Sequence, residues 1–156
     1  MVLAFSSLAA SAVSLGYLPE ETEVWAPLPP LAQGDTIDAS GYALEAFGQG
    51  AYMITEGTYQ ALIVVSNEGV ILVDAPPALG PFIDHAIGNL TSLPLTHIVY
   101  SHHHSDHIRA ASLFAKSYVK IVAHEITKHN LEAVAHPTRP LPTVTFADHY
   151  HLHVGN

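Results

Sequence analysis

Runs of β-branched and aliphatic residues divide the chain from residue 42 onward into short segments with the character of strands. Glycine, asparagine or proline bounds each run, as is typical of strands joined by tight turns. We therefore expect strands over residues 42–47, 51–55, 59–66 and 70–74. The turn Asn67-Glu68-Gly69 would join the last two into a hairpin at the centre of a sheet.

Helix-like and strand-like patterns alternate in the remaining chain. Apolar residues spaced three and four apart predict helices over 79–93, 107–116 and 125–135, with Ser105 as N-cap of the second. Strands are expected over 95–101, 118–123, 143–146 and 150–154. A β-meander followed by alternating helices and strands predicts an α/β fold, with a mixed sheet and flanking helices, in one domain over residues 42–156.

The first 41 residues read as a separate lead-in. Residues 1–18 are apolar and rich in small side chains, and Ala10-Ser11-Ala12 resembles a signal cleavage site. This stretch contains no Lys or Arg, although secretory signals begin with a positively charged region. Residues 19–41 are rich in proline and acids, which favours an extended or disordered segment. These features favour a cytoplasmic location, with a weak signal peptide and secretion or the periplasm as the alternative.

Charge and composition exclude several partners. The formal net charge is −9, and the first Lys or Arg in the chain is Arg109. Nucleic acid and acidic membrane surfaces are therefore unexpected partners, because both require basic protein surfaces. No apolar run reaches the roughly 18 residues that span a bilayer. The chain has no cysteine, so any metal must be held by nitrogen and oxygen. The oligomeric state stays open.

The segment Ser101–His107 concentrates potential metal ligands between an expected strand and an expected helix. In extended backbone, residues two apart face the same way, so His102 and His104 can point to one site while His103 points elsewhere. Asp106 and His107 would follow from the start of the helix. Imidazole and carboxylate ligands suit zinc, manganese or iron. A solvated, His-rich loop is the alternative reading, because the chain contains 12 histidines.

The pattern His102-x-His104-x-Asp106-His107 resembles the signature of the metallo-β-lactamase superfamily, a group of αββα hydrolases. The segment from Gly69 to Pro76 is similar to that family's strand ending in Asp, and 96–102 is similar to its strand leading into the motif. The resemblance covers roughly residues 42–156. It implies a metal-dependent hydrolase, with zinc at one or two positions (iron or manganese as alternatives) and a small-molecule substrate.

The resemblance also implies a role for each residue of the motif. His102 and His104 would bind a first metal, and Asp106 and His107 a second, with a hydroxide between them that attacks an ester, lactone, amide or thioester. Asp106 would in addition orient this nucleophile, which makes it the expected catalytic residue. Asp74 would orient the histidine loop through hydrogen bonds, or else be an ordinary carboxylate at a strand end.

Further ligands in that family follow well downstream of the motif, and this sequence ends at Asn156. We therefore expect only the first half of the αββα fold, C-terminally truncated, incomplete or inactive as an isolated enzyme, with one apolar sheet face uncovered. His124 would line the site or lie in a partly exposed loop. Other histidines are expected at surface or packing positions, with 149, 151 and 153 sharing one face of a strand as a metal patch or a solvent-facing edge: His85, His97, His129, His136, His149, His151 and His153.

Two alternative functions remain open at this point. A truncated enzyme could act as a non-catalytic metal-binding module. An iron-dependent oxidoreductase or dioxygenase of the same fold is the other alternative. Metal analysis and turnover measurements separate these hypotheses.

Overall fold

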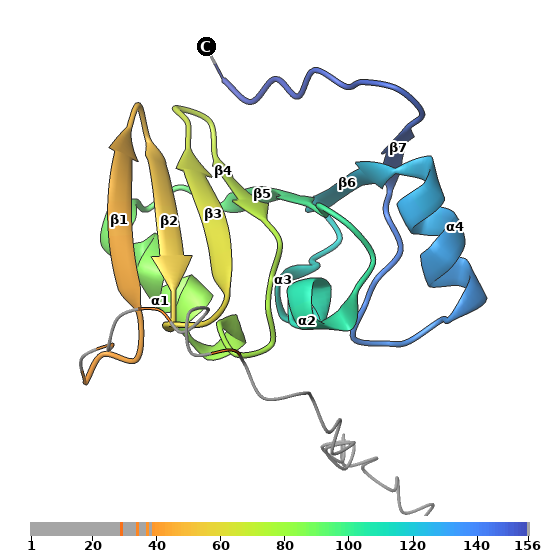
Figure 1. The fold of residues 1–156 in the computed structure, drawn as a ribbon. Coiled ribbons are helices and arrows are strands. Elements are labelled where there is room, and N and C mark those ends of the chain that lie inside the picture. Colours follow the sequence, from red (N-terminus) through yellow and green to blue (C-terminus); the bar gives the residue numbers. More distant parts are fainter. Residues whose placement is uncertain (1–28, 30–33, 35–36, 38, 156) are drawn as a thin grey trace, which may run out of the picture.

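The computed structural model describes residues 29, 34, 37 and 39–155, so nearly all of the expected lead-in lies outside the described residues. Seven strands form one sheet (Figure 1). They are β1 (Ala43–Gly48), β2 (Ala51–Thr55), β3 (Gln60–Val65), β4 (Val70–Val73), β5 (Leu95–Val99), β6 (Lys120–His124) and β7 (Val144–Phe146).

The strands lie in the sheet in the order in which they occur in the chain. β1 to β4 pair antiparallel, and β4 to β7 pair parallel. The predicted hairpin of β3 and β4 is confirmed, with Leu62 opposite Val73 and Val65 opposite Val70. The predicted α/β class with a mixed sheet is therefore confirmed.

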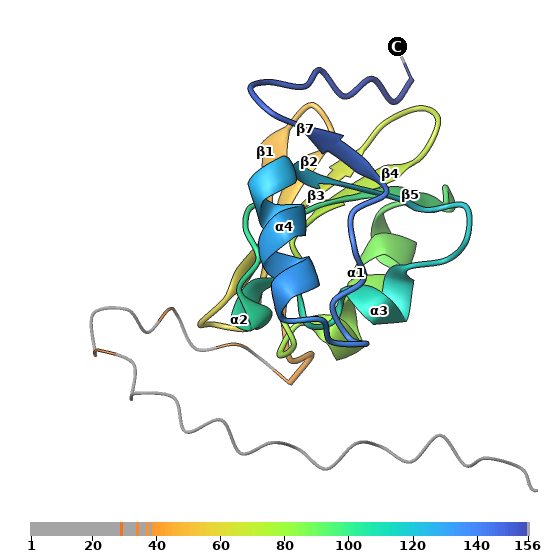
Figure 2. The ribbon, with the colours of Figure 1, turned by 90° about the vertical axis from the view of Figure 1, so that its right-hand side faces the viewer.

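Four helices connect the parallel strands: α1 (Gly80–Leu90), α2 (Ser105–Ile108), α3 (Ala111–Phe114) and α4 (Glu125–Ala133). Each crossover leads to the next strand in the same direction, and crossovers of one hand place their helices on one face of a sheet. Figure 2 shows α1, α3 and α4 on the same side of the strands. Ile83 of α1, Phe114 of α3 and Leu131 of α4 accordingly join one buried core. None of the described helices has the length and apolar character needed to cross a membrane.

The two faces of the sheet differ in burial. On the helix-covered face, Ile63, Leu72 and Ile98 are fully buried. On the opposite face, Leu62 pairs with Val73, and both side chains are only half-buried. Strands with apolar residues on both faces are typical of sheets covered on both sides. Here the described helices cover one side.

Two sequence predictions about the elements are wrong. The expected helix over 107–116 is divided into α2 and α3, because the loop after β4 captures its backbone: Ala75 N–H donates to His107 O (2.8 Å), and Ala110 N–H donates to Ala75 O (3.0 Å). α2 begins at Ser105, two residues before the expected start at 107, so His104, not Ser105, occupies the N-cap position.

Residues 150–154 form no strand, contrary to prediction. The ring of Tyr150 stacks on that of Phe146 at a centroid distance of 6.0 Å, which turns the chain back over the sheet instead of alongside β7. The segment then ends beside Asn67 in the β3–β4 turn. Figure 2 shows it crossing on the side of the sheet opposite to the helices.

Candidate metal centre

The candidate site lies where β4 and β5 end. Because these neighbouring strands run parallel, their carboxyl ends meet at one edge of the sheet, a common place for ligand sites in α/β proteins. Asp74 directly follows β4 and is 6% exposed. Its φ of 63° lies in the left-handed region, which aspartate tolerates better than most residues. This turn directs the Asp74 carboxylate toward the end of β5.

The Asp74 carboxylate ties the histidine loop to β4. Oδ1 accepts a hydrogen bond from Ser101 N (2.8 Å), and Oδ2 accepts one from Ser101 Oγ (2.6 Å). Asp74 N–H donates to Val99 O (2.9 Å), which extends the strand pairing past the end of β4. The start of the loop is thus fixed by three hydrogen bonds before the first histidine.

Three of the four predicted ligands, His102, His104 and His107, lie close together beyond Ser101. The His102 ring lies 4.3 Å from that of His107 and 4.7 Å from that of His104, measured between centroids. Potential ligand atoms of Asp74, His102 and His107 all lie within 4.8 Å of one another. The tightest group therefore contains Asp74, while His104 adjoins it through ring contact with His102.

Asp106 lies between His107 and Tyr59, which directly precedes β3. Its Oδ2 is 3.8 Å from His107 Nε2 and accepts a hydrogen bond of 3.4 Å from Tyr59 Oη. The rings of Tyr59 and His107 also meet edge to face at 5.9 Å. Sequence reasoning did not single out Tyr59, because nothing in the residues around it indicates proximity to a motif 47 positions away.

The nitrogen atoms of His107 have different surroundings. Nδ1 is buried, and it lies 3.3 Å from Asp74 Oδ2 without a well-oriented hydrogen bond. Nε2 instead faces Asp106. A proton on Nδ1 next to the Asp74 carboxylate would leave Nε2 as the electron-pair donor on the Asp106 side.

The donor set fits a divalent cation of the zinc type. Zinc lies about 2.0–2.2 Å from nitrogen and oxygen ligands, so two donors on one ion lie at most about 4.4 Å apart. The 3.8 Å between His107 Nε2 and Asp106 Oδ2 meets this limit. The 4.8 Å that bounds the distances among Asp74, His102 and His107 lies slightly above this limit.

Protonation in the site favours neutral imidazole. Burial lowers the pKa of His102, and the neighbouring His107 and His104 lower it further. Neutral imidazole is the form that binds metals. Burial first, and then the Asp106 carboxylate, raise the pKa of Tyr59, so its hydroxyl keeps its proton and remains a donor.

His103 points away from this group, toward α4. Its Nδ1 lies 3.3 Å from Asn130 Nδ2, and its carbonyl oxygen accepts a hydrogen bond from Arg139 Nη1 (3.2 Å). Burial lowers the pKa of His103, and His104 and Arg139 add to this effect. The loop is therefore held on one side by Asp74 and on the other by the segment around α4.

The other histidines do not join the site. His124 caps α4 by accepting from Ile126 N (3.1 Å), and its Nε2 lies 2.6 Å from Ala147 O, so both ring nitrogens are engaged elsewhere. His129 is exposed on α4. His85 contacts the hydroxyl of Tyr42. His149, His151 and His153 are exposed and lie in the segment that forms no strand.

Comparisons with known proteins agree with this geometry. The family model of the metallo-beta-lactamase superfamily matches residues 54–142. No curated protein matches the chain. Solved structures with the same fold include a metallo-beta-lactamase from Pontibacter korlensis (TM-score 0.59, 21% identity, 73% of this chain and 56% of that one). Another is metallo-beta-lactamase MIM-1 from Novosphingobium pentaromativorans (TM-score 0.59, 18% identity, 71% of this chain and 46% of that one).

A third similar structure is MEM-A1, a subclass B3 metallo-beta-lactamase from a soil metagenome library (TM-score 0.54, 21% identity, 74% of this chain and 47% of that one). The chain thus spans about half the length of the solved structures that it matches. At these identities the structures establish the fold, and the family model, which covers more than half of the chain, establishes the family. The chain belongs to the metallo-beta-lactamase superfamily.

Proposed function

We propose that this protein is a metal-dependent hydrolase acting on an ester, lactone, amide or thioester bond of a small molecule. His102, His104, Asp106 and His107 would hold the metal, with zinc favoured by the imidazole and carboxylate donors, and iron or manganese as alternatives. One observation carries the proposal: potential ligand atoms of His102 and His107 lie within 4.8 Å of each other and of the Asp74 carboxylate, at the ends of two parallel strands.

A divalent cation at this position would supply Lewis acidity toward a carbonyl and would lower the pKa of a bound water toward about 7. The chain's own residues prepare the site for it. Asp74 fixes Ser101 and lies against His107 Nδ1, which directs Nε2 of His107 toward Asp106. Asp106 carries the carboxylate that can orient a nucleophile, and Tyr59 offers a protonated hydroxyl beside it.

Similarity supports the proposal at the level of the fold. The similar solved structures are named metallo-beta-lactamases, and the matched region of the family model includes the whole motif. Because the chain spans about half the length of those structures, the activity of the whole enzyme is part of the proposal.

Metal content and turnover test the proposal together. The purified chain, loaded with zinc, iron or manganese, is assayed against a panel of chromogenic esters, lactones, thioesters and β-lactams. We expect His102→Ala to lose bound metal and hydrolysis, whereas His129→Ala, a matched change on the exposed face of α4, retains both. Metal uptake with no turnover on any substrate would favour a binding module, and oxygen-dependent turnover with iron would favour an oxidoreductase. Full activity in His102→Ala would refute the proposed site.

A further inference from the structure

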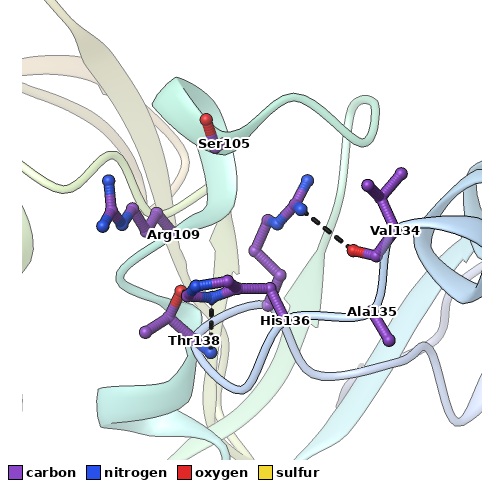
Figure 3. Close-up of a pocket in the computed structure, with 7 residues that line it drawn as sticks. Ser105, Arg109, Val134, Ala135, His136 and Thr138 are labelled. Carbon is purple, nitrogen blue, oxygen red and sulfur yellow. Dashed lines mark hydrogen bonds between the residues drawn. The ribbon is translucent and has the colours of Figure 1, made fainter. Parts of the chain in front are cut away.

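Both arginines of the chain line one pocket beside the histidine loop. The pocket lies between α2 and the segment that links α4 to β7, and has a volume of about 220 Å³ (Figure 3). Its lining consists of Ser105, Arg109, Val134, Ala135, His136, Thr138 and Arg139. Neither Arg109 nor Arg139 belongs to the proposed metal ligands, so this is a second polar site.

The charge of this pocket contrasts with that of the molecule. The chain has a net charge of −9 and only five Lys and Arg residues, of which two meet here. None of the lining residues is acidic. Arginine remains protonated at every physiological pH, so the positive charge is permanent. The permanently charged residues of the lining are therefore both cationic, in an otherwise acidic protein.

Arg139 is held in place by neutral acceptors. Nη1 donates to His103 O (3.2 Å) and Nη2 donates to Val134 O (3.1 Å). Within the described part of the chain, no carboxylate forms an ion pair with Arg139. A guanidinium group has five N–H donors, and these two bonds occupy two of them. The group is thus oriented without being neutralised.

The other polar groups of the lining are also donors. His136 Nδ1 accepts a hydrogen bond from Thr138 N (3.3 Å), so its ring proton lies on Nε2 in the neutral form. Ser105 and Arg109 lie one helical turn apart, and their side chains therefore face the same side of α2. Figure 3 labels Ser105, Arg109, His136 and Thr138 among the residues that line the pocket.

We propose that this pocket binds an anion, in the form of a carboxylate or phosphate group. Planar guanidinium groups recognise both through paired N–H···O bonds. The volume of about 220 Å³ exceeds the roughly 30 Å³ of one water molecule severalfold, so a polyatomic anion fits. Because Arg139 also holds the carbonyl of His103, the occupied pocket would brace the loop that carries His102 and His104.

Binding is tested with inorganic phosphate and with acetate on the metal-free protein in EDTA at pH 8, by isothermal titration calorimetry. We expect saturable binding of at least one anion, weakened about tenfold or more by Arg109→Gln and less by Arg109→Lys, which keeps the charge. Lys116→Gln removes a positive charge from an exposed position outside the pocket and should leave the affinity unchanged. Urea unfolding of each variant establishes that it is folded.

Two results would overturn the proposal: no saturable binding of either anion, or equal weakening by Arg109→Gln and Lys116→Gln. Because this arm requires neither metal nor turnover, its outcome is independent of the proposed function.

A second arm distinguishes a free anion from the charged group of a substrate. The metal-loaded protein hydrolyses a neutral ester and its carboxylate-bearing analogue, each with and without Arg109→Gln. A rise in KM for the charged analogue alone places a substrate group in the pocket. Equal KM values together with saturable phosphate binding identify a free anion as the occupant.

Discussion

At the scale of single residues, Asp74 joins two strands through one carboxylate. It leaves β4 with a left-handed backbone, accepts both hydrogen bonds from Ser101 and lies against His107. Hydrogen bonds to a charged acceptor contribute about 1.5–3 kcal/mol each, and a buried donor left without a partner costs a similar amount. The stability of the protein should therefore depend on both the shape and the charge of the side chain at position 74.

Asp74→Ala should lower the free energy of unfolding by about 2–4 kcal/mol, because it leaves the Ser101 N–H unpaired and because alanine tolerates the left-handed backbone of this position less well than aspartate. Asp74→Asn keeps the size, one carbonyl acceptor and tolerance for positive φ, so we expect a loss of about 1–2 kcal/mol. Urea unfolding measures both. Equal losses in the two variants would contradict the role of the acceptor atoms.

His97 should make stability depend on pH. Burial lowers its pKa, and the facing Lys120 lowers it further, so the folded protein takes up this proton at lower pH than the unfolded chain. Its contribution is therefore fully present above the unfolded pKa of about 6.5 and is lost as the pH falls through the folded pKa. The ring also contacts Thr96 Oγ1 at 2.9 Å.

The test compares urea midpoints of the wild-type protein and His97→Gln at pH 8 and pH 5. The wild type should lose more stability between these pH values than the variant, because glutamine does not titrate. The same loss in both proteins would assign the acid sensitivity to other histidines.

At the scale of elements, close packing at the start of α1 explains why glycine occurs there. A Cβ on Gly80 would lie 2.9 Å from Ala110 Cβ and 3.2 Å from Leu113 Cδ1, so α1 approaches α3 through this glycine. Gly88, in the same helix, would place a Cβ in open space. The same substitution should therefore have opposite effects at the two positions.

We expect Gly80→Ala to destabilise the protein by about 1–3 kcal/mol through overpacking, and Gly88→Ala to stabilise it by about 0.5–1 kcal/mol through helix propensity. Thermal and urea unfolding measure the stability of both variants, and each variant serves as the control for the other. Stabilisation by both would mean that α3 shifts freely away from α1.

Local sequence patterns predicted the elements whose formation depends on their own residues. The β-branched and aliphatic runs predicted all seven strands of the sheet to within about two residues at either end, and the β3–β4 hairpin followed from its turn. The break between α2 and α3 was not predicted, because it depends on hydrogen bonds to Ala75, a distant residue. Stacking of Tyr150 on Phe146 likewise overrode the strand pattern of 150–154.

The residues of the candidate site likewise include some that local sequence patterns predict and some that only the tertiary fold brings together. The spacing of His102, His104, Asp106 and His107 is a local pattern, and Asp74 follows from the strand before it. Tyr59 beside Asp106, and Arg109 beside Arg139, come together only through the tertiary fold. The spacing of residues in a single sequence does not predict contacts between segments that are far apart in the chain.

At the scale of the whole molecule, metal binding should be linked to stability. A ligand that binds only the folded state at 100 times its Kd stabilises it by about 2.7 kcal/mol. Zinc should therefore raise the melting temperature of the wild type and of His129→Ala, but not of His102→Ala, and EDTA should reverse the rise. Differential scanning calorimetry gives this measurement without reference to any substrate. An equal rise in His102→Ala would show that zinc binds elsewhere, for example at the exposed histidines 149, 151 and 153.

The agreement between strand order and chain order has a consequence for biosynthesis. Each strand pairs with the strand synthesised immediately before it, so no pairing has to wait for a distant part of the chain. Pairing between consecutive strands keeps the sequence separation of the contacts shorter than pairing between distant strands would. During translation, Asp74 can meet Ser101 and His107 once α2 has left the ribosome, before α4 and β7 have emerged from it. The candidate metal site can therefore take shape on the nascent chain, at an edge of the sheet on which the later strands assemble.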